Sequence, residues 1–228
     1  MQIVVASAFR NAAYFVPRYL DQIVRLRDVL RTHTVRVLAV EGDSSDDTTR
    51  RSLTIGAKAW DVDLQLVECH HGGPEFGSTE SPERMEALSL VSNTIFANVR
   101  HDDDILVYVE SDLRWDPSTI AVLIDEASQG QYVIAPLVFA GALFYDVWGF
   151  RGLDGQRFSP FAPYHSSLEG HPNEVVEIAS AGSCLVMPSN IGASVRIPDD
   201  NALVGWCGQA RRQGYFIGVH TGLRIQHP

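Results

Sequence analysis

The sequence predicts a single α/β domain, and three observations support this prediction. Apolar strand-like runs alternate with amphipathic helix-like segments, which is the order typical of α/β domains. The chain has 228 residues, enough for one full hydrophobic core. Apolar residues make up 45% of the sequence and charged residues 20%, as in ordinary soluble domains, and no apolar run is long enough to span a bilayer.

The expected strands are short runs rich in apolar residues. They occupy residues 2–6, 35–40, 64–68, 105–109, 132–135, 175–187, 215–219 and 223–225. A first helix is expected to begin at Pro17, because proline suits the first helical position. A second is expected to begin near Thr48, with Asp46 and Thr48 as cap residues.

Three more helices are expected in the rest of the chain. Ser81 and Pro82 are a typical N-cap and first helical position for the third. The fourth and fifth are predicted over 120–127 and 203–213 from apolar residues at helical spacing. Gly214 suits the position that closes the fifth helix.

Charge and cysteine content restrict the partners and the compartment. The net charge of −10 and the pI of about 5.2 argue against nonspecific binding of nucleic acid through a broad basic face. The three cysteines are widely spaced, which suits a reducing compartment and shows no zinc-ligand spacing. The N-terminus enters a strand at once, without the basic region of a signal peptide. We therefore expect a cytoplasmic protein without a membrane span.

The segment 105–117 is the most informative for function. Five apolar residues lead directly into Glu110-Ser-Asp112. Residues i and i+2 of a strand lie on the same face, so the two carboxylates are expected to project together from the strand end. A divalent cation with oxygen ligands is a natural partner for such a pair. The alternative is a strand that simply ends in a polar turn begun by Asp112.

Five segments, in order along the chain, resemble motifs of one known family. They are 6–11 (ASAFRN), 40–48 (VEGDSSDDT), 110–112 (ESD), 210–215 (ARRQGY) and His227. The family is that of the GT-A nucleotide-sugar glycosyltransferases of the family 2 type. In the same order, the five segments resemble its opening strand and turn, its V-D-D-G-S-x-D-x-T motif, its D-x-D motif, its R-x-x-G-Y helix ending and its C-terminal metal-binding histidine. The resemblance covers nearly the whole chain. It implies a GT-A, Rossmann-like mixed sheet with flanking helices in a single domain, 1–228.

The resemblance also implies a metal site. Asp112 and His227 are the expected direct ligands, and Glu110 is expected either as a ligand or as a partner of the ribose. A bound Mn²⁺ or Mg²⁺ would stabilise the negative charge that develops on a leaving diphosphate. A histidine ligand favours Mn²⁺, because imidazole is the softer donor. The alternative for His227 is a disordered terminal histidine.

The first half, 1–115, is expected to bind the nucleoside-diphosphate sugar. The residues expected to contact it are Ser7, Arg10, Asn11, Glu41, Asp43, Arg84 and Glu110. The family uses an acidic residue at the end of the second strand to accept from the uracil N–H, which favours a UDP-linked donor. Here Gly42 replaces the second aspartate of the motif, so either Glu41 or Asp43 would take this role. Arg84 could donate to the diphosphate or be an exposed arginine without a special contact.

The general base is expected just before the last helix. Family members often carry Glu-Asp there, and Asp199 and Asp200 are the nearest candidates, although Pro198-Asp-Asp-Asn is also an ordinary turn. The resemblance alone implies an inverting transfer, in which a carboxylate takes the proton of the acceptor hydroxyl.

The second half, 116–228, is expected to bind the acceptor. Residues 141–172 are rich in glycine, proline and aromatic residues, and a long irregular stretch inside a domain is usually functional. Four aromatic residues could stack on a sugar or an extruded base, although at least half of them are expected to fill the core: Trp148, Phe150, Tyr164 and Trp206. The acceptor could be a saccharide, a small molecule or a hydroxymethylated base in viral DNA. A nucleotidyltransferase and a noncatalytic sugar- or nucleotide-binding domain are the alternative functions.

Overall fold

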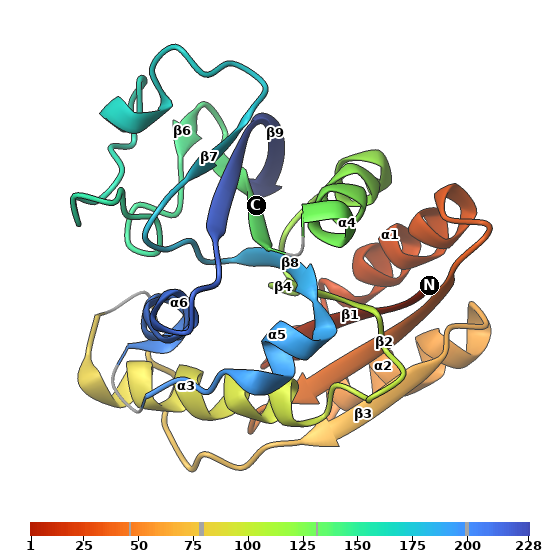
Figure 1. Ribbon diagram of the computed structural model, residues 1–228. Coiled ribbons are helices and arrows are strands. Elements are labelled where there is room, and N and C mark those ends of the chain that lie inside the picture. Colours follow the sequence, from red (N-terminus) through yellow and green to blue (C-terminus); the bar gives the residue numbers. More distant parts are fainter. Residues whose placement is uncertain (46, 78–79, 131, 199–200) are drawn as a thin grey trace.

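The computed structural model describes residues 1–45, 47–77, 80–130, 132–198 and 201–228. Within these residues, nine strands form one sheet (Figure 1). The strands are β1 (Gln2–Phe9), β2 (Thr34–Glu41), β3 (Leu64–Glu68), β4 (Ile105–Val109), β5 (Val133–Ala140), β6 (Leu143–Phe144), β7 (Val175–Glu177), β8 (Cys184–Pro188) and β9 (Ile217–His227). Their order in the sheet is β3-β2-β1-β4-β8-β5-β9-β7, and β6 pairs with β5.

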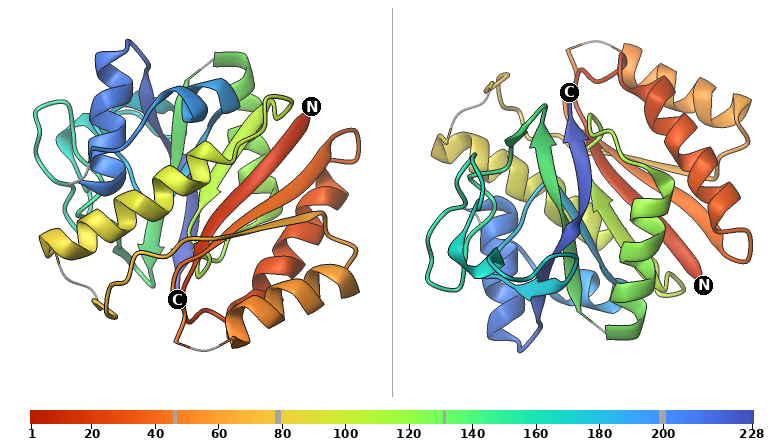
Figure 2. Two further views of the ribbon diagram at one scale, coloured as in Figure 1. Left: turned by 90° about the horizontal axis from the view of Figure 1, so that it is seen from below. Right: turned by 90° about the horizontal axis from the view of Figure 1, so that it is seen from above.

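The strand directions bring the strand ends that matter for function to one edge. Strands β1, β2, β3 and β4 are parallel, and β5 is parallel to β9. Strand β8 lies between β4 and β5 and is antiparallel to both, so β5 and β9 run in the same direction as β4. The carboxyl ends of all six strands therefore meet the amino end of β8 at one edge. Figure 2 shows the chain's C-terminus at this edge and its N-terminus at the opposite one.

Helices cover both faces of the sheet (Figure 1). They are α1 (Val16–Val29), α2 (Thr48–Ala59), α3 (Pro82–Ala97), α4 (Pro117–Gly130), α5 (Ser189–Ser194) and α6 (Ala202–Arg212). Helix α1 packs against α2 and α4 on one face, and α3 packs against α5 and α6 on the other. Between the two layers, the central strand β4 is buried along its whole length, as its continuous apolar sequence predicts.

Two of the predicted helix ends are confirmed, and one cap differs. The Ser81 hydroxyl accepts from the Arg84 amide at 3.2 Å at the start of α3. Gly214 follows α6 with a φ of +88°, a conformation that glycine adopts without strain. At the start of α2 the N-cap is Asp47, whose side chain makes no capping bond within the described residues, and Thr48 is the first helical residue. Asp46 lies outside the described residues.

Two predicted strand boundaries were wrong. The run 175–187 is not one strand, because a turn ending at Ser183, with a φ of +57°, separates β7 from β8. These two strands then pair at different places in the sheet, with β9 and with β4 and β5. Conversely, residues 215–225 contain one strand rather than two. The pairing with β5 shifts register between Pro136 and Leu137, so β9 continues through Thr221, Gly222 and Leu223, which have no partners in β5.

Candidate active site

Asp112 and His227 meet at the carboxyl edge of the sheet. Asp112 follows β4, and two residues later Arg114 exchanges two backbone hydrogen bonds with Gln226, of 2.7 and 2.8 Å. This bridge fixes the end of β9 beside the segment after β4. As a result, Asp112 Oδ2 lies 3.2 Å from His227 Nε2. His227 is thus the last residue of an ordered strand, and the alternative of a disordered terminal histidine was wrong.

The surroundings of this pair leave one acceptor atom open. Asp112 Oδ1 is buried and has no hydrogen-bond partner within the described residues. The Arg18 guanidinium of α1 donates to the main-chain oxygen of Asp112. The ring of Tyr145 stacks on His227, with centroids 3.8 Å apart and planes 14° apart. The two side chains are therefore held in place, while Asp112 keeps unused acceptor capacity at Oδ1.

Glu110 lies next to this pair in a strongly anionic environment. The pKa of Glu110 is raised to about 8, mainly by burial and also by the nearby charges of Asp112 and Asp146. A hydrogen bond with Ser183 and the charge of Arg84 act in the opposite direction. The structure thus brings the predicted Glu110, Asp112, Arg84 and His227 together. Within the described residues, no three or more His, Cys, Asp or Glu side chains form a group that could hold a metal by themselves.

Asp146 belongs to this cluster and was missed by the sequence analysis. Its carboxylate accepts from the Gly149 amide at 2.9 Å and from the Ser183 hydroxyl at 3.0 Å. Burial is the main reason why its pKa is raised. Asp146 follows the short apolar strand β6 much as Asp112 follows β4, which is the signal that could have found it. The aromatic residues around it in the sequence predict stacking rather than a carboxylate site.

The loop after β3 crosses the ends of β1 and β2. Arg10 donates to the carbonyl oxygens of Gly73 and Pro74, both at 2.8 Å. The Asn11 side chain pairs with Glu75 and accepts from the Ser45 amide at 2.8 Å. A surface hollow of about 290 Å³ lies here, lined by Asn11, Ala13, Ser45, Thr48, Thr49 and Glu75. Arg10 and Asn11 are therefore together, as predicted, and both are bonded to this loop or to the segment after β2.

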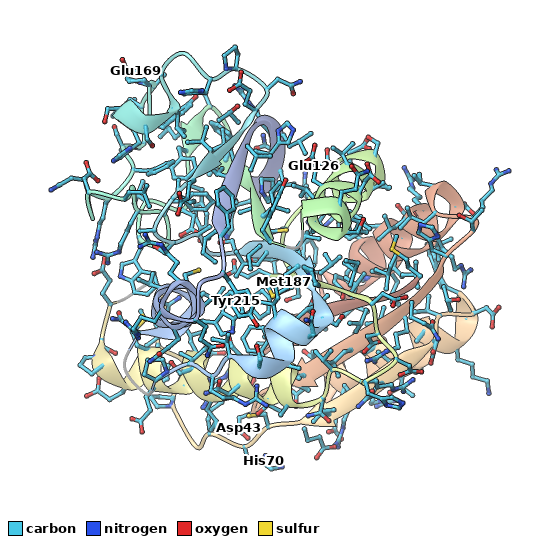
Figure 3. The ribbon with its side chains drawn as sticks, viewed as in Figure 1. Asp43, His70, Glu126, Glu169, Met187 and Tyr215 are labelled. Atoms are coloured by element: carbon cyan, nitrogen blue, oxygen red, sulfur yellow. The ribbon has the colours of Figure 1, made fainter. Side chains whose placement is uncertain are left out.

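Asp43 holds the same loop from the end of β2. Its carboxylate accepts from His70 Nδ1 at 2.8 Å and from the amides of His71 and Gly72 at 2.8 and 2.7 Å. The hydrogen bond from His70 is the main reason why the pKa of Asp43 is lowered to about 2. Figure 3 shows Asp43 and His70 side by side on the outside of the molecule. Asp43 has a φ of +51°, at the position where the family motif carries glycine.

The other predicted residues are distributed as follows. Glu41 is buried and accepts from the Ser44 amide at 2.9 Å. Ser7 is fully buried and donates to the Tyr19 hydroxyl at 2.9 Å, so the structure does not bring its side chain to the edge with the others. Asp199 and Asp200 lie outside the described residues. Phe150 and Trp206 are fully buried, which confirms that at least half of the four aromatic residues fill the core.

Comparison with known proteins identifies the family. The family described as Cryptococcal mannosyltransferase 1 matches residues 2–184. The chain belongs to this family. It is therefore a member of a glycosyltransferase family, as the motifs predicted. No curated protein matches the sequence significantly.

Solved structures share the fold. A mannosyltransferase from Pyrobaculum calidifontis, PcManGT, in complex with GDP-Man and Mn²⁺, is 16% identical with a TM-score of 0.63, over 98% of this chain and 56% of that one. S. aureus TarS 1–349 in complex with UDP-GlcNAc is 15% identical with a TM-score of 0.55, over 99% and 58%. M. tuberculosis glucosyl-3-phosphoglycerate synthase is 16% identical with a TM-score of 0.50, over 98% and 71%.

These similarities confirm the predicted GT-A, Rossmann-like fold with its mixed sheet. The chain spans less than two thirds of the length of PcManGT and of the TarS fragment. None of the helices in the described residues has both the length and the apolar character needed to cross a membrane.

Proposed function

We propose that the chain is a metal-dependent glycosyltransferase that moves a sugar from a nucleoside-diphosphate sugar to an acceptor hydroxyl. The observation that carries this proposal is the Asp112–His227 pair, held 3.2 Å apart at the carboxyl edge of the sheet. Ligands of open α/β sheets bind outside this edge. The family match favours a glycosyltransferase over the nucleotidyltransferase and the noncatalytic binding domain.

The residues present fit a divalent cation. Asp112 Oδ1 is a buried acceptor without a partner within the described residues, and His227 adds a nitrogen donor beside it. Mg²⁺ and Mn²⁺ in phosphate-transferring sites usually take one or two carboxylates and complete their coordination with substrate phosphates and water. Asp112 and His227 would hold the ion, with Glu110 as a third ligand or as a partner of the ribose. The ion would stabilise the charge that develops on the leaving diphosphate.

The reaction itself is a single exchange of bonds. The acceptor oxygen forms a bond to the anomeric carbon, and the bond between that carbon and the diphosphate oxygen breaks. The nucleoside diphosphate leaves with the electron pair. We propose that Asp199 or Asp200 is the general base that takes the acceptor proton, and that the configuration at the anomeric carbon is inverted.

The donor nucleotide is proposed to lie across the ends of β1 and β2. Arg10, Asn11, Glu41 and Asp43 gather there with the loop after β3. We propose uracil as the nucleobase of the donor. The solved structures with this fold include one with GDP-Man and one with UDP-GlcNAc, so both classes of donor have to be tested. The acceptor is proposed to enter from 141–172, the turn before β8 and Asp199-Asp200.

A screen of sugar nucleotides tests the proposal. GDP-mannose, UDP-glucose and UDP-N-acetylglucosamine are incubated with the protein and Mn²⁺, and the release of nucleoside diphosphate is measured; saccharides and DNA with hydroxymethylated bases are then tried as acceptors. Asp112→Ala removes a negative charge that faces the diphosphate, so we expect turnover to fall by orders of magnitude. Asp28→Ala, an exposed residue of α1, is the matched control. Turnover that survives both Asp112→Ala and EDTA would contradict the proposal.

A further inference from the structure

Asp146 carries a carboxylate that has no role yet in the proposed reaction. Its two oxygens accept one hydrogen bond each, from the Gly149 amide and from the Ser183 hydroxyl. An ionised carboxylate has about four acceptor positions, so each oxygen of Asp146 keeps capacity for another donor. The residue as a whole is half-buried rather than enclosed in the core.

The turn before β8 is shaped around this carboxylate. A Cβ atom on Gly182 would lie 2.6 Å from Asp146 Oδ2, so only glycine allows the close approach. Ser183 adopts a left-handed conformation, with a φ of +57°, which is strained for a residue other than glycine. In this conformation its hydroxyl reaches Asp146 and its carbonyl oxygen accepts from the Glu110 amide at 2.9 Å. Asp146 is thereby fixed relative to the end of β4.

The order of the strands locates Asp146 relative to the donor. Along the carboxyl edge, β2 and β1 carry the proposed nucleotide residues, β4 leads to Asp112, and β8 begins after Ser183. A sugar nucleotide along this edge, with its nucleoside over β2 and β1 and its diphosphate at Asp112, would have its sugar beside the start of β8. Tyr145, the neighbour of Asp146, stacks on His227 and so keeps Asp146 next to the Asp112–His227 pair.

On the basis of the proposed function, we infer that Asp146 accepts hydrogen bonds from hydroxyl groups of the donor sugar and so holds and selects that sugar. Sugar hydroxyls are donors that suit an acceptor-only carboxylate, and such charge-assisted bonds are stronger than neutral ones. A site built to bond a particular hydroxyl rejects analogues that lack it. Burial raises the pKa of the free Asp146 carboxyl, and donors from the sugar would offset this cost of burying a charge.

The test compares the binding of sugar nucleotides with that of nucleoside diphosphates alone. Isothermal titration in the presence of Mn²⁺ measures GDP-mannose and UDP-glucose against GDP and UDP, for the wild type and for Asp146→Asn. We expect Asp146→Asn to weaken the binding of the sugar nucleotide by about 10- to 100-fold, because a hydrogen bond to a charged group is lost. The binding of GDP or UDP should not change. Glu169→Gln, an exposed carboxylate in the same region, is the control and should change neither affinity.

Each of the other possible binding results leads to a different conclusion about Asp146. An equal loss for sugar nucleotide and nucleoside diphosphate would assign Asp146 to the metal or diphosphate side and overturn the inference, as would unchanged binding of both. If Asp146→Asn does not fold, Ser183→Ala serves instead, because it keeps the carboxylate but removes the hydrogen bond to Oδ2. We then expect a smaller loss of affinity, confined to the sugar nucleotide. A wild type that binds neither class of ligand would refute the proposed function itself, and the assignment of Asp146 with it.

Discussion

Asp112 Oδ2 lies 3.2 Å from His227 Nε2, although the two residues come from separate elements of the sheet. Neither side chain alone determines this contact. The backbone bridge between Arg114 and Gln226 sets the position of the β9 end, and Arg18 holds the Asp112 carbonyl from the side of α1. The pair is therefore built by main-chain hydrogen bonds, which makes each side chain replaceable without loss of the fold.

The first prediction concerns the histidine of this pair. We expect His227→Ala to weaken Mn²⁺ binding by at least about tenfold, since even the loss of a residue that only supports a metal ligand costs about 10- to 100-fold. The measurement is titration with Mn²⁺ followed by electron paramagnetic resonance. His101→Ala, at an exposed histidine before β4, is the matched control and should bind Mn²⁺ like the wild type. Equal affinities for the wild type and His227→Ala would remove His227 from the proposed metal site.

The second prediction concerns stability. Arg36 Nε donates to Asp103 Oδ1 at 2.8 Å, and the two side chains are only 5% and 2% exposed. Removing one partner leaves a buried charge without compensation, so we expect Asp103→Ala to lower the free energy of unfolding by about 3–5 kcal/mol. Urea denaturation measures this change. Asp102→Ala, at the exposed neighbour, should change it little, and a similar small effect of Asp103→Ala would contradict the prediction.

Much of the fold was predictable because local patterns determine it. The apolar run 105–109 gave β4 with its correct bounds, and the Ser81-Pro82 pair gave the start of α3. The pairing of strands was harder, since it depends on contacts distant in sequence. Residues 175–187 looked like one strand because their apolar residues continue past the small residues before Ser183. Only tertiary contacts separate β7 from β8 there.

The candidate site was predictable to the extent that it follows strand ends. Glu110, Asp112 and His227 each follow or end an apolar strand, and the structure brings them together with Arg84. Ser7 also lies near a strand end, but its side chain faces the core and pairs with Tyr19, which depends on the packing of α1. Asp146 was missed because its importance comes from Ser183 and Gly149, which the chain brings to it through turns rather than through a regular pattern.

The third prediction concerns the loop after β3, which Asp43 anchors. The folded pKa of Asp43 lies below its ordinary value of 3.8, so its contribution to stability is complete above that pH and is lost as the pH falls through about 2. The hydrogen bond and charge of Asp43 raise the pKa of His70 above its ordinary 6.5. The contribution of His70 is therefore complete below 6.5 and is lost as the pH rises through the raised value.

Asp43→Asn should accordingly be less stable than the wild type by the largest margin between pH 3.8 and 6.5. The difference in thermal unfolding midpoint, measured at a series of pH values, should narrow on both sides of this window. When His70→Gln is present in both proteins, the narrowing on the alkaline side should disappear, and that on the acid side should shrink because His70 is the main cause of the low Asp43 pKa. A margin that stays constant across the whole series would mean that ionisation of this pair does not anchor the loop.

The fourth prediction concerns the acceptor side. Phe161 is 66% exposed on the 141–172 segment and is free to stack on an acceptor. If it stacks on a sugar or base, Phe161→Ala should cost about 1–3 kcal/mol of acceptor binding, or roughly 5- to 150-fold in affinity. Metal-dependent hydrolysis of the donor should remain near the wild-type rate. Trp60→Ala, at an exposed aromatic residue after α2, is the control. Equal impairment of hydrolysis and transfer by Phe161→Ala, without unfolding, would assign the segment to the donor site instead.

The last prediction separates a DNA acceptor from a small one. The chain carries a net charge of −10, so binding of DNA would require its basic residues to act locally against an overall repulsion. Each phosphate contact releases counterions, and transfer to DNA with hydroxymethylated bases should therefore fall steeply with added salt. Transfer to a neutral saccharide should hardly change over the same range. The measurement is the initial rate of transfer at increasing salt for each acceptor, with donor hydrolysis in the absence of acceptor as the reference. Salt-insensitive transfer to the better acceptor would favour a small or neutral molecule, because no phosphate contacts would then contribute to its binding.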